Sequence, residues 1–139
     1  SFDEKTVMSL DASGVASMLG NMPRMALKTT EETDSIAGFL CHKTIANFTT
    51  DSVPAIVLYH TSEIIFEDPN WWNQFNGCKE VLLGYEVEQY GMRMRLLATS
   101  VLMEEVDDQV FKIPEGYSAV DWQGMHSKIK GLLDQFQED

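Results

Sequence analysis

The segment from Val81 to Val101 constrains the fold more than any other part of the chain. It reads VLLGYEVEQY, then Gly91, then MRMRLLATSV. Apolar residues alternate with Gly84 and glutamates in the first half, and with arginines in the second half. A period of two residues is typical of a strand that buries one face. Because little more than Gly91 separates the two halves, we predict an antiparallel hairpin.

One face of this hairpin is predicted to be buried and the other to be exposed to solvent. The apolar face is expected to hold Val81, Leu83, Tyr85, Val87, Met92, Met94, Leu96 and Ala98. On the outer face, Arg93 and Arg95 are expected to meet Glu86 or Glu88 on the neighbouring strand. Such exposed ion pairs contribute well under about 1 kcal/mol each, so they fix the register more than they stabilise the fold.

Further strands are predicted on both sides of this hairpin. The expected strands are 4–10, 25–34, 39–48 and 55–61, with a short edge piece ending at Phe111 and Ile113. SIAG at 35–38 and TTDSVP at 49–54 are predicted turns. A long connection with two adjacent tryptophans then leads to Val81. The chain is therefore expected to be rich in antiparallel sheet.

Two amphipathic helices are predicted outside these strands. Val15, Met18, Leu19 and Met22 follow helical spacing, with Asp11 or Ser13 as the cap and Gly20, Asn21 and Pro23 at the end. A helix of two turns is not stable alone in water, so it must lie on something apolar. The second stripe comprises Trp122, Met125, Ile129, Leu132, Leu133 and Phe136, with Asp121 as the cap. This helix is expected to dock on the sheet or on a partner.

Composition limits the class of protein. The chain has 139 residues, 44% hydrophobic and 23% charged, which suits one folded domain. No apolar run approaches the roughly 20 residues of a membrane helix. The net charge of −12 repels nucleic-acid phosphates, so nucleic-acid binding is not expected.

Few residues suggest chemistry. His42, His60 and His126 lie in different predicted elements without metal-ligand spacing, and no nucleophile motif is present. We therefore predict a non-enzymatic protein without metal or cofactor. Cys41 and Cys78 fit no metal site; they either stay free or, in an exported protein, form a bridge that contributes roughly 4 kcal/mol. The methionines either line a binding site for an apolar ligand or fill gaps in an ordinary core.

The order of motifs across residues 32–117 resembles a known family. The motifs are ETDSIAGFLCHK (32–43), AIVLYHTSEI (55–64), DPNWWNQFNG (68–77), VLLGYEVEQYGMRMRLLATSV (81–101) and DDQVFKIPEGY (107–117). Together they resemble exported Bacteroidetes proteins of unknown function, which are similar to the GLPGLI proteins and to outer-membrane lipoprotein carriers of the LolA type.

The resemblance implies an α+β fold: a curved antiparallel sheet that forms an incomplete LolA-like barrel, partly covered by the short Met-rich helix and the final helix. Residues 1–139 would form a single domain, in the periplasm or associated with the outer membrane. Family members usually have further strands before residue 4, so the resemblance implies a processed or truncated chain whose open sheet edge favours a homodimer or strand exchange.

The implied function is to hold an apolar ligand, a lipid or a lipidated protein or peptide, in the concave sheet. Val81, Leu83, Tyr85 and Met94 are expected to face this shared concavity. The two tryptophans would lie at its rim, or else form a structural corner. The predicted ligand-binding residues are Met18, Met22, Trp71, Trp72, Tyr85, Val87, Met92 and Met94. The alternative is a protein interaction or dimerisation module without a small-molecule ligand.

Overall fold

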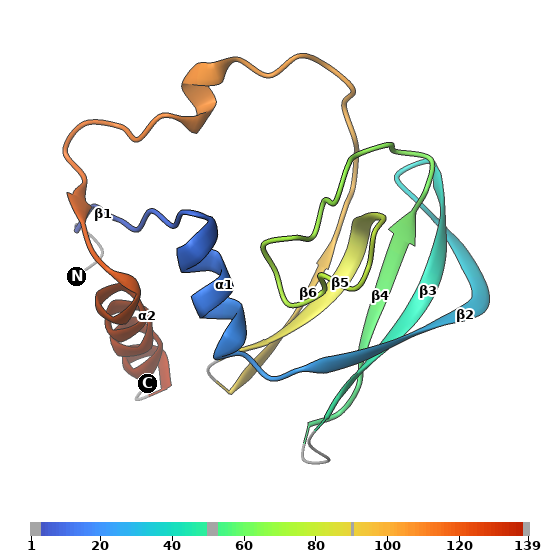
Figure 1. Cartoon of the computed structure of the whole chain (residues 1–139), viewed down its shortest axis with the longest axis horizontal. Helices are drawn as coiled ribbons and strands as arrows, with labels where there is room; N and C mark the ends of the chain where they lie inside the picture. Colours follow the sequence, from blue (N-terminus) through green and yellow to red (C-terminus); the bar gives the residue numbers. More distant parts are fainter. Residues whose placement is uncertain (1–3, 50–52, 90, 138–139) are drawn as a thin grey trace. The chain divides into compact units, whose positions relative to one another are not determined.

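The computed structural model describes residues 4–49, 53–89 and 91–137. The chain divides into two compact units, which are described separately. The sheet unit comprises Ala12–Leu102, and the terminal unit comprises Ser1–Asp11 and Met103–Asp139. The fold is α+β, with a five-stranded antiparallel sheet in the first unit and a short parallel pair in the second (Figure 1).

The sheet unit is built on an antiparallel meander in which sequential strands are neighbours. Its strands are β2 (Met25–Ile36), β3 (Phe39–Phe48), β4 (Ile56–Thr61), β5 (Val81–Gln89) and β6 (Met92–Leu97), in the order β2-β3-β4-β5-β6. The predicted strands 25–34, 39–48, 55–61 and 81–101 are confirmed with small shifts of their ends. Residues 50–52 of the predicted turn at 49–54, and Tyr90, lie outside the described residues.

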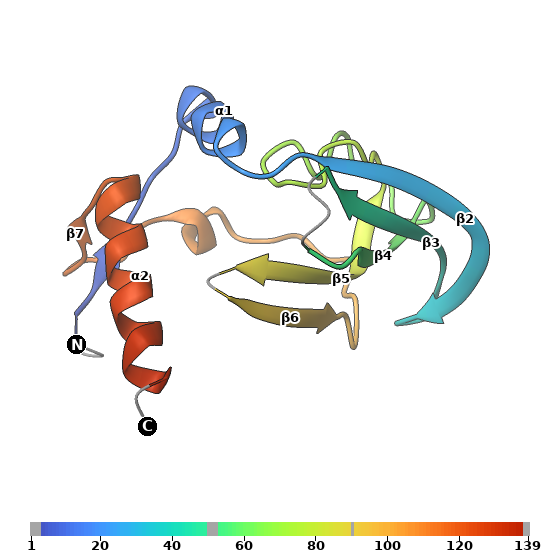
Figure 2. The same ribbon diagram turned by 90° about the horizontal axis from the view of Figure 1, so that it is seen from below.

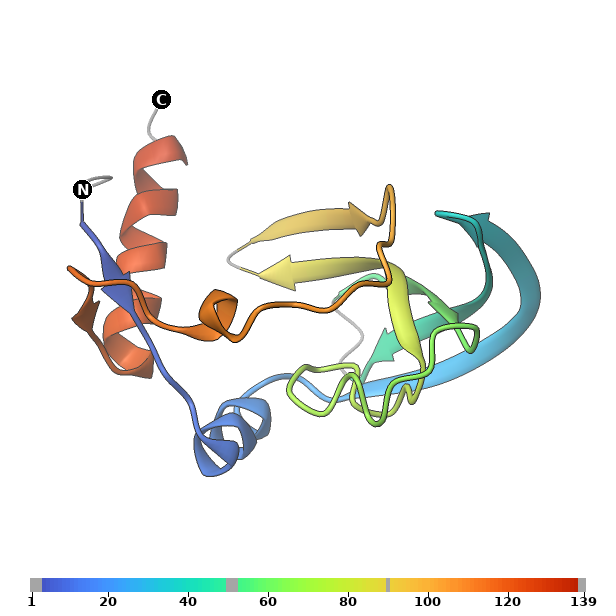
Figure 3. The ribbon, with the colours of Figure 1, turned by 90° about the horizontal axis from the view of Figure 1, so that it is seen from above.

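The sheet is strongly curved but is not a closed barrel. Figures 2 and 3 show β2 bending along its length, with β3 following it. The register between these strands shifts between Thr29 and Thr33, and such an irregularity increases the local bend of a strand. At the start of β3, Ala37 and Gly38 form the tight turn, both with positive φ.

A bulge in β5 corrects the predicted face of Leu83. Tyr59 of β4 pairs with Gly84, but the next residue, His60, pairs with Leu82, so Leu83 is the extra residue. The bulge reverses the alternation: Leu83 packs with Ile36 and Cys41, whereas Tyr85 packs against the core of the other face. The prediction that Leu83 shares a face with Tyr85 and Val87 is therefore wrong.

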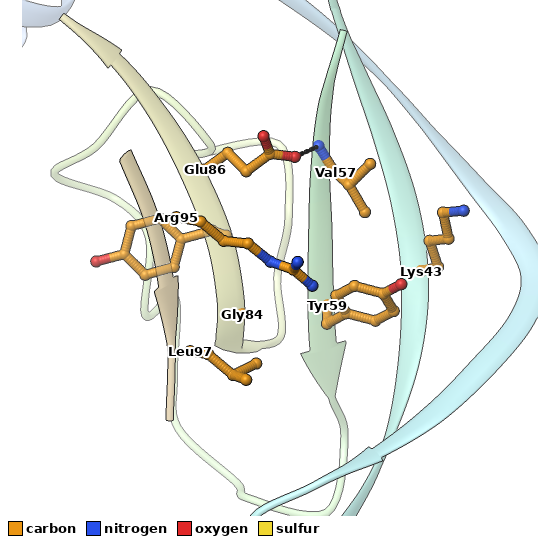
Figure 4. Close-up of a pocket in the computed structure, with 8 residues that line it drawn as sticks. Lys43, Val57, Tyr59, Gly84, Glu86, Arg95 and Leu97 are labelled. Carbon is orange, nitrogen blue, oxygen red and sulfur yellow. Dashed lines mark hydrogen bonds between the residues drawn. The ribbon is translucent and has the colours of Figure 1, made fainter. Parts of the chain in front are cut away.

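Beyond the bulge, β4 and β5 separate, and side chains bridge the gap between them. In the described part of the chain their register ends at the Tyr59–Gly84 pair. Glu86 Oε1 then accepts the backbone N–H of Val57 at 3.1 Å (Figure 4). Arg93 of β6 donates to the carbonyl oxygens of Pro54 at 2.7 Å and Ala55 at 3.4 Å. Polar side chains thus replace the missing ladder.

Each face of the sheet has its own apolar cluster. Ala46, Ile56, Leu58 and Phe75 form the cluster on the Tyr85 face, with Leu82 packed against it. Ile36, Cys41 and Leu83 form the cluster on the opposite face, with Tyr59 packed against it. The sheet is therefore apolar on both sides near its middle, unlike the predicted pattern of one buried and one wet face.

On the edge strand β6, side-chain exposure also differs from the predicted pattern of one buried and one exposed face. Met94 and Leu96 are 44% and 42% exposed, although they share a face with Val87 and Tyr85 through their register. On the other face, the Arg93 side chain is only 31% exposed and pairs with Glu88 at 2.9 Å. The expectation that Met94 is buried in a concavity is therefore wrong.

The terminal unit combines short elements with one longer helix. β1 (Thr6–Val7) pairs in parallel with β7 (Ser118–Ala119), so the predicted strand 4–10 is much shorter than expected. The predicted edge piece before Ile113 is instead a 3₁₀ helix, η1 (Asp108–Phe111), because Asp107 caps it by accepting the Gln109 N–H at 2.9 Å.

The final helix covers the predicted stripe from 122 to 136 and extends one residue further. Helix α2 covers Trp122–Gln137, and Asp121 caps it by accepting the Gly124 N–H at 2.7 Å. Lys128 pairs with Glu4 at 2.7 Å, which ties the helix to the N-terminal segment of its own unit. Phe136, the last member of the predicted stripe, is 64% exposed. The predicted docking of this stripe stays a prediction.

Candidate functional site

An apolar cavity of about 380 Å³ opens on the Tyr85 face of the sheet unit. Helix α1 (Ala12–Gly20), the loop before β5, and β5 itself provide its walls. The lining residues are Met18, Met22, Pro69, Asn70, Trp72, Asn73, Gln74, Phe75, Val81, Leu82, Tyr85, Val87 and Gln89. This lining is uncharged throughout, so it suits an apolar or neutral ligand.

Five of the eight predicted ligand-binding residues line this cavity. They are Met18, Met22, Trp72, Tyr85 and Val87. The structure brings them together although they lie far apart in the sequence. Met92 and Met94 share the face by register with Gln89 and Val87, but they are not part of the lining.

The two tryptophans differ in their relation to the cavity. Trp72 lines it and is 52% exposed, as expected for a side chain at the mouth. Trp71 is 49% exposed and is outside the lining. The two neighbours therefore point different ways, and neither is a core residue.

The side chains that hold the tryptophan loop in place are Phe75 and Asn70, which sequence reasoning missed. Phe75 is 2% exposed and packs edge-on against Tyr85, with ring centroids 6.0 Å apart. Asn70 is 4% exposed and donates to the carbonyl oxygens of Cys78 and Glu80, both at 2.9 Å. The sequence signal for Phe75 is an aromatic residue inside a turn-rich segment, where it is less conspicuous than the two adjacent tryptophans.

A buried polar network crosses the sheet beside this loop. His60 Nε2 lies 2.6 Å from Thr44 Oγ1, and His60 Nδ1 lies 2.5 Å from Glu80 Oε1. A hydroxyl, an imidazole and a carboxylate in this order can activate a nucleophile. However, Thr44 is 2% exposed, and its hydroxyl also bonds Thr29 Oγ1 at 3.0 Å. This geometry ties strands and loop together, and it leaves the hydroxyl almost fully covered.

Both cysteines are free and buried. Burial raises the pKa of the Cys41 thiol and of the Cys78 thiol, so both stay protonated and weakly reactive near neutral pH. Cys78 Sγ donates to the Glu80 carbonyl oxygen at 3.6 Å. The two alternatives for the cysteines were free thiols and a disulfide bridge, and the structure shows free thiols.

The described residues show neither a metal-binding cluster nor a membrane-spanning helix. They contain no group of three or more His, Cys, Asp and Glu side chains placed to hold a metal ion. Within them, no helix has the length and apolar character needed to cross a membrane. Comparisons of the chain with models of protein families, with curated proteins and with solved structures find no match.

Proposed function

We propose that the sheet unit binds an apolar ligand, a lipid or the acyl group of a lipidated peptide, in the cavity beneath Trp72. The observation that carries this proposal is the uncharged lining, to which α1, the tryptophan loop and β5 all contribute. A volume of about 380 Å³ lies at the lower end of the roughly 300–1,000 Å³ typical of small-molecule sites. This volume suits a single acyl chain better than several.

The lining residues suit a ligand of variable shape. Met18 and Met22 have flexible thioether side chains that adapt to irregular apolar surfaces. Trp72 can cover the ligand with its ring while its indole N–H meets water. The proposal is supported further by the resemblance of residues 32–117 to exported Bacteroidetes proteins of unknown function, which are similar to carriers of the LolA type. This resemblance also suggests a periplasmic or outer-membrane location.

A fluorescent probe tests this proposal. N-phenyl-1-naphthylamine is uncharged and becomes fluorescent in apolar sites, so saturable binding to the whole chain is expected. Val87→Asp places a charge in the lining and should weaken binding at least about tenfold, since an unpaired charge in an apolar site costs more than 1.4 kcal/mol. Val110→Asp is the matched control, because Val110 is 70% exposed on η1.

Circular dichroism of each variant separates lost binding from lost folding. Equal binding by the wild type and the folded Val87→Asp variant would contradict the assignment of the cavity. Native mass spectrometry of protein purified from a membrane-containing host should additionally show a co-purified lipid mass.

The alternative function is dimerisation through β6. Met94, Leu96 and Leu97 are all more than 40% exposed on this edge strand, where unpaired backbone groups can pair with another chain. Sedimentation velocity discriminates the two functions: a ligand-free dimer that dissociates on Leu96→Lys supports the interface, whereas a monomer that binds the probe supports the ligand site.

A further inference from the structure

A second cavity, of about 200 Å³, lies on the opposite face of the sheet from the apolar one. Its lining comes from four adjacent strands: Lys43, Val57, Tyr59, Gly84, Tyr85, Glu86, Arg95 and Leu97. It lies where β4 and β5 begin to separate (Figure 4). The two cavities share Tyr85 and no other lining residue. Unlike the first, this cavity contains charged side chains.

Arg95 is the unusual member of this lining. Its neighbour across the strands is Glu86, which would normally neutralise it. Instead, Glu86 uses one carboxylate oxygen for the Val57 N–H at 3.1 Å, and its other oxygen lies 3.9 Å from Arg93. Within the described residues, Arg95 makes no ion pair. Because β4 and β5 are separated here, Glu86 is turned toward Val57 and does not pair with Arg95.

The Arg95 side chain reaches across the cavity and not out from the sheet edge. Figure 4 shows it extending over Gly84 toward Tyr59. Gly84 leaves the floor open, because a Cβ there would lie 3.3 Å from Leu97 and 3.4 Å from Tyr59. A guanidinium in this position presents its donors toward a small space lined by apolar side chains such as Val57 and Leu97 and by charged ones.

A second cation flanks the same space. Lys43 of β3 lies beyond Tyr59, and its ammonium group pairs with Glu32 at 2.8 Å. That partner is 68% exposed, so the pair is well hydrated and contributes little that holds Lys43 in place. In Figure 4 the ammonium group points away from Arg95, so Lys43 would have to leave Glu32 to contact an anion there.

We propose that this cavity binds a small organic carboxylate. The Arg95 guanidinium would hold the carboxylate by two parallel hydrogen bonds, a geometry that suits planar carboxylates. Lys43 would supply the second positive charge, and a short apolar substituent would lie against Val57 and Leu97. The Glu86 carboxylate in the same lining repels any anion, and it repels an ion of higher charge, such as phosphate, more strongly than a carboxylate.

Butyrate is the probe for this site. Titration of the isotope-labelled whole chain is followed by amide and arginine Nε–H resonances, against sodium chloride at equal ionic strength. Saturable shifts are expected at Tyr59, Gly84 and Arg95. Arg95→Gln should weaken butyrate binding at least about tenfold, because it removes hydrogen bonds to a charged group, and Arg95→Lys should give an intermediate loss.

Arg24→Gln is the matched control, since it removes the same charge from an exposed position outside the cavity. Its affinity for butyrate should stay within about twofold of wild type, because distant exposed charges are screened. Equal weakening by Arg24→Gln and Arg95→Gln, or shifts that do not saturate, would overturn the site. Tighter binding of inorganic phosphate than of butyrate would overturn the ligand class.

Butyrate binding is expected to be independent of the apolar cavity. Val87→Asp should leave butyrate binding unchanged, because Val87 lines only the other cavity. A folded Val87→Asp variant that lost butyrate binding would contradict two separate sites.

Discussion

Glu86 holds the backbone N–H of Val57 where β4 and β5 part. The bond of 3.1 Å replaces a hydrogen bond that a regular ladder would supply from a carbonyl group. This one carboxylate also explains why Arg95 makes no ion pair within the part of the chain that the structure describes, since Glu86 is turned toward Val57 and Arg93. The same side-chain placement thus bridges the opening in the sheet and leaves Arg95 without an ion pair among the described residues.

Glu86→Ala tests the bridging role of this carboxylate. Removing it leaves the Val57 N–H without its acceptor and Arg93 with one fewer carboxylate, so we expect a loss of about 1–3 kcal/mol in the free energy of unfolding. Glu86→Gln keeps an acceptor oxygen and should lose less. Urea unfolding measures both, with Glu105→Ala as an exposed control. Equal stability of the two Glu86 variants would mean that the bond to Val57 is unimportant.

Phe75→Ala tests which aromatic residue anchors the tryptophan loop. Phe75 is 2% exposed and belongs to the cluster with Ile56 and Leu58, so its removal should cost about 3–5 kcal/mol. Phe111→Ala is the matched control: Phe111 is 77% exposed, and the change should stay within about 0.5 kcal/mol. Denaturant midpoints give the comparison. A similar small loss for both would show that the loop does not depend on its buried ring.

The sequence pattern predicted the strands well because their alternation is local information. The β2–β3 and β5–β6 hairpins and the cap at Asp121 all depend on residues close together in the chain. The face of Leu83 could not be obtained this way. One extra residue in β5 reverses the alternation, and the bulge is fixed by the pairing of His60 with Leu82 on another strand.

The candidate site was predicted only in part for the same reason. The side-chain chemistry of Met18, Trp72 and Tyr85 indicates apolar binding, and the fold brings them together. The roles of Phe75 and Asn70 depend on tertiary contacts of an irregular loop, which has no period to reveal them. Arg95 was expected to pair with a glutamate, and only the separation of β4 and β5 shows why it does not.

The buried thiols should make stability fall at alkaline pH. Burial raises the pKa of Cys41 and Cys78 in the folded chain above the value of about 8.5 expected when it is unfolded. Their contribution is therefore fully present below the unfolded pKa, and it is lost as the pH rises from there through the folded pKa. Urea midpoints should fall between pH 8 and 10, and less so in a Cys41→Ala, Cys78→Ala variant.

Thiol labelling checks the same burial directly. At pH 7.5 a disulfide reagent should react slowly with the native chain and rapidly with both cysteines in urea, because the reactive thiolate is scarce and covered in the fold. Fast reaction of both thiols in the native chain would contradict the packing around Cys41 and Cys78.

Asn70→Asp tests whether the loop positions the wall of the apolar cavity. The Asn70 amide donates to two carbonyl oxygens, of Cys78 and Glu80, whereas a carboxylate of the same shape cannot donate and is repelled by them. With Asn70 only 4% exposed, we expect a loss of about 1–3 kcal/mol in stability. Because Asn70 and Trp72 line the same cavity, affinity for the uncharged fluorescent probe should fall as well.

Asn76→Asp controls for the added charge, since Asn76 is an exposed residue of the same loop and is outside the lining. It should change neither the urea midpoint nor the probe affinity appreciably. If Asn70→Asp lowered stability but left probe binding intact, the loop would be a structural corner only, and α1 and β5 would have to hold the ligand without it. Loss of both in Asn70→Asp, with Asn76→Asp like wild type, would tie the fold of this loop to the binding of the ligand.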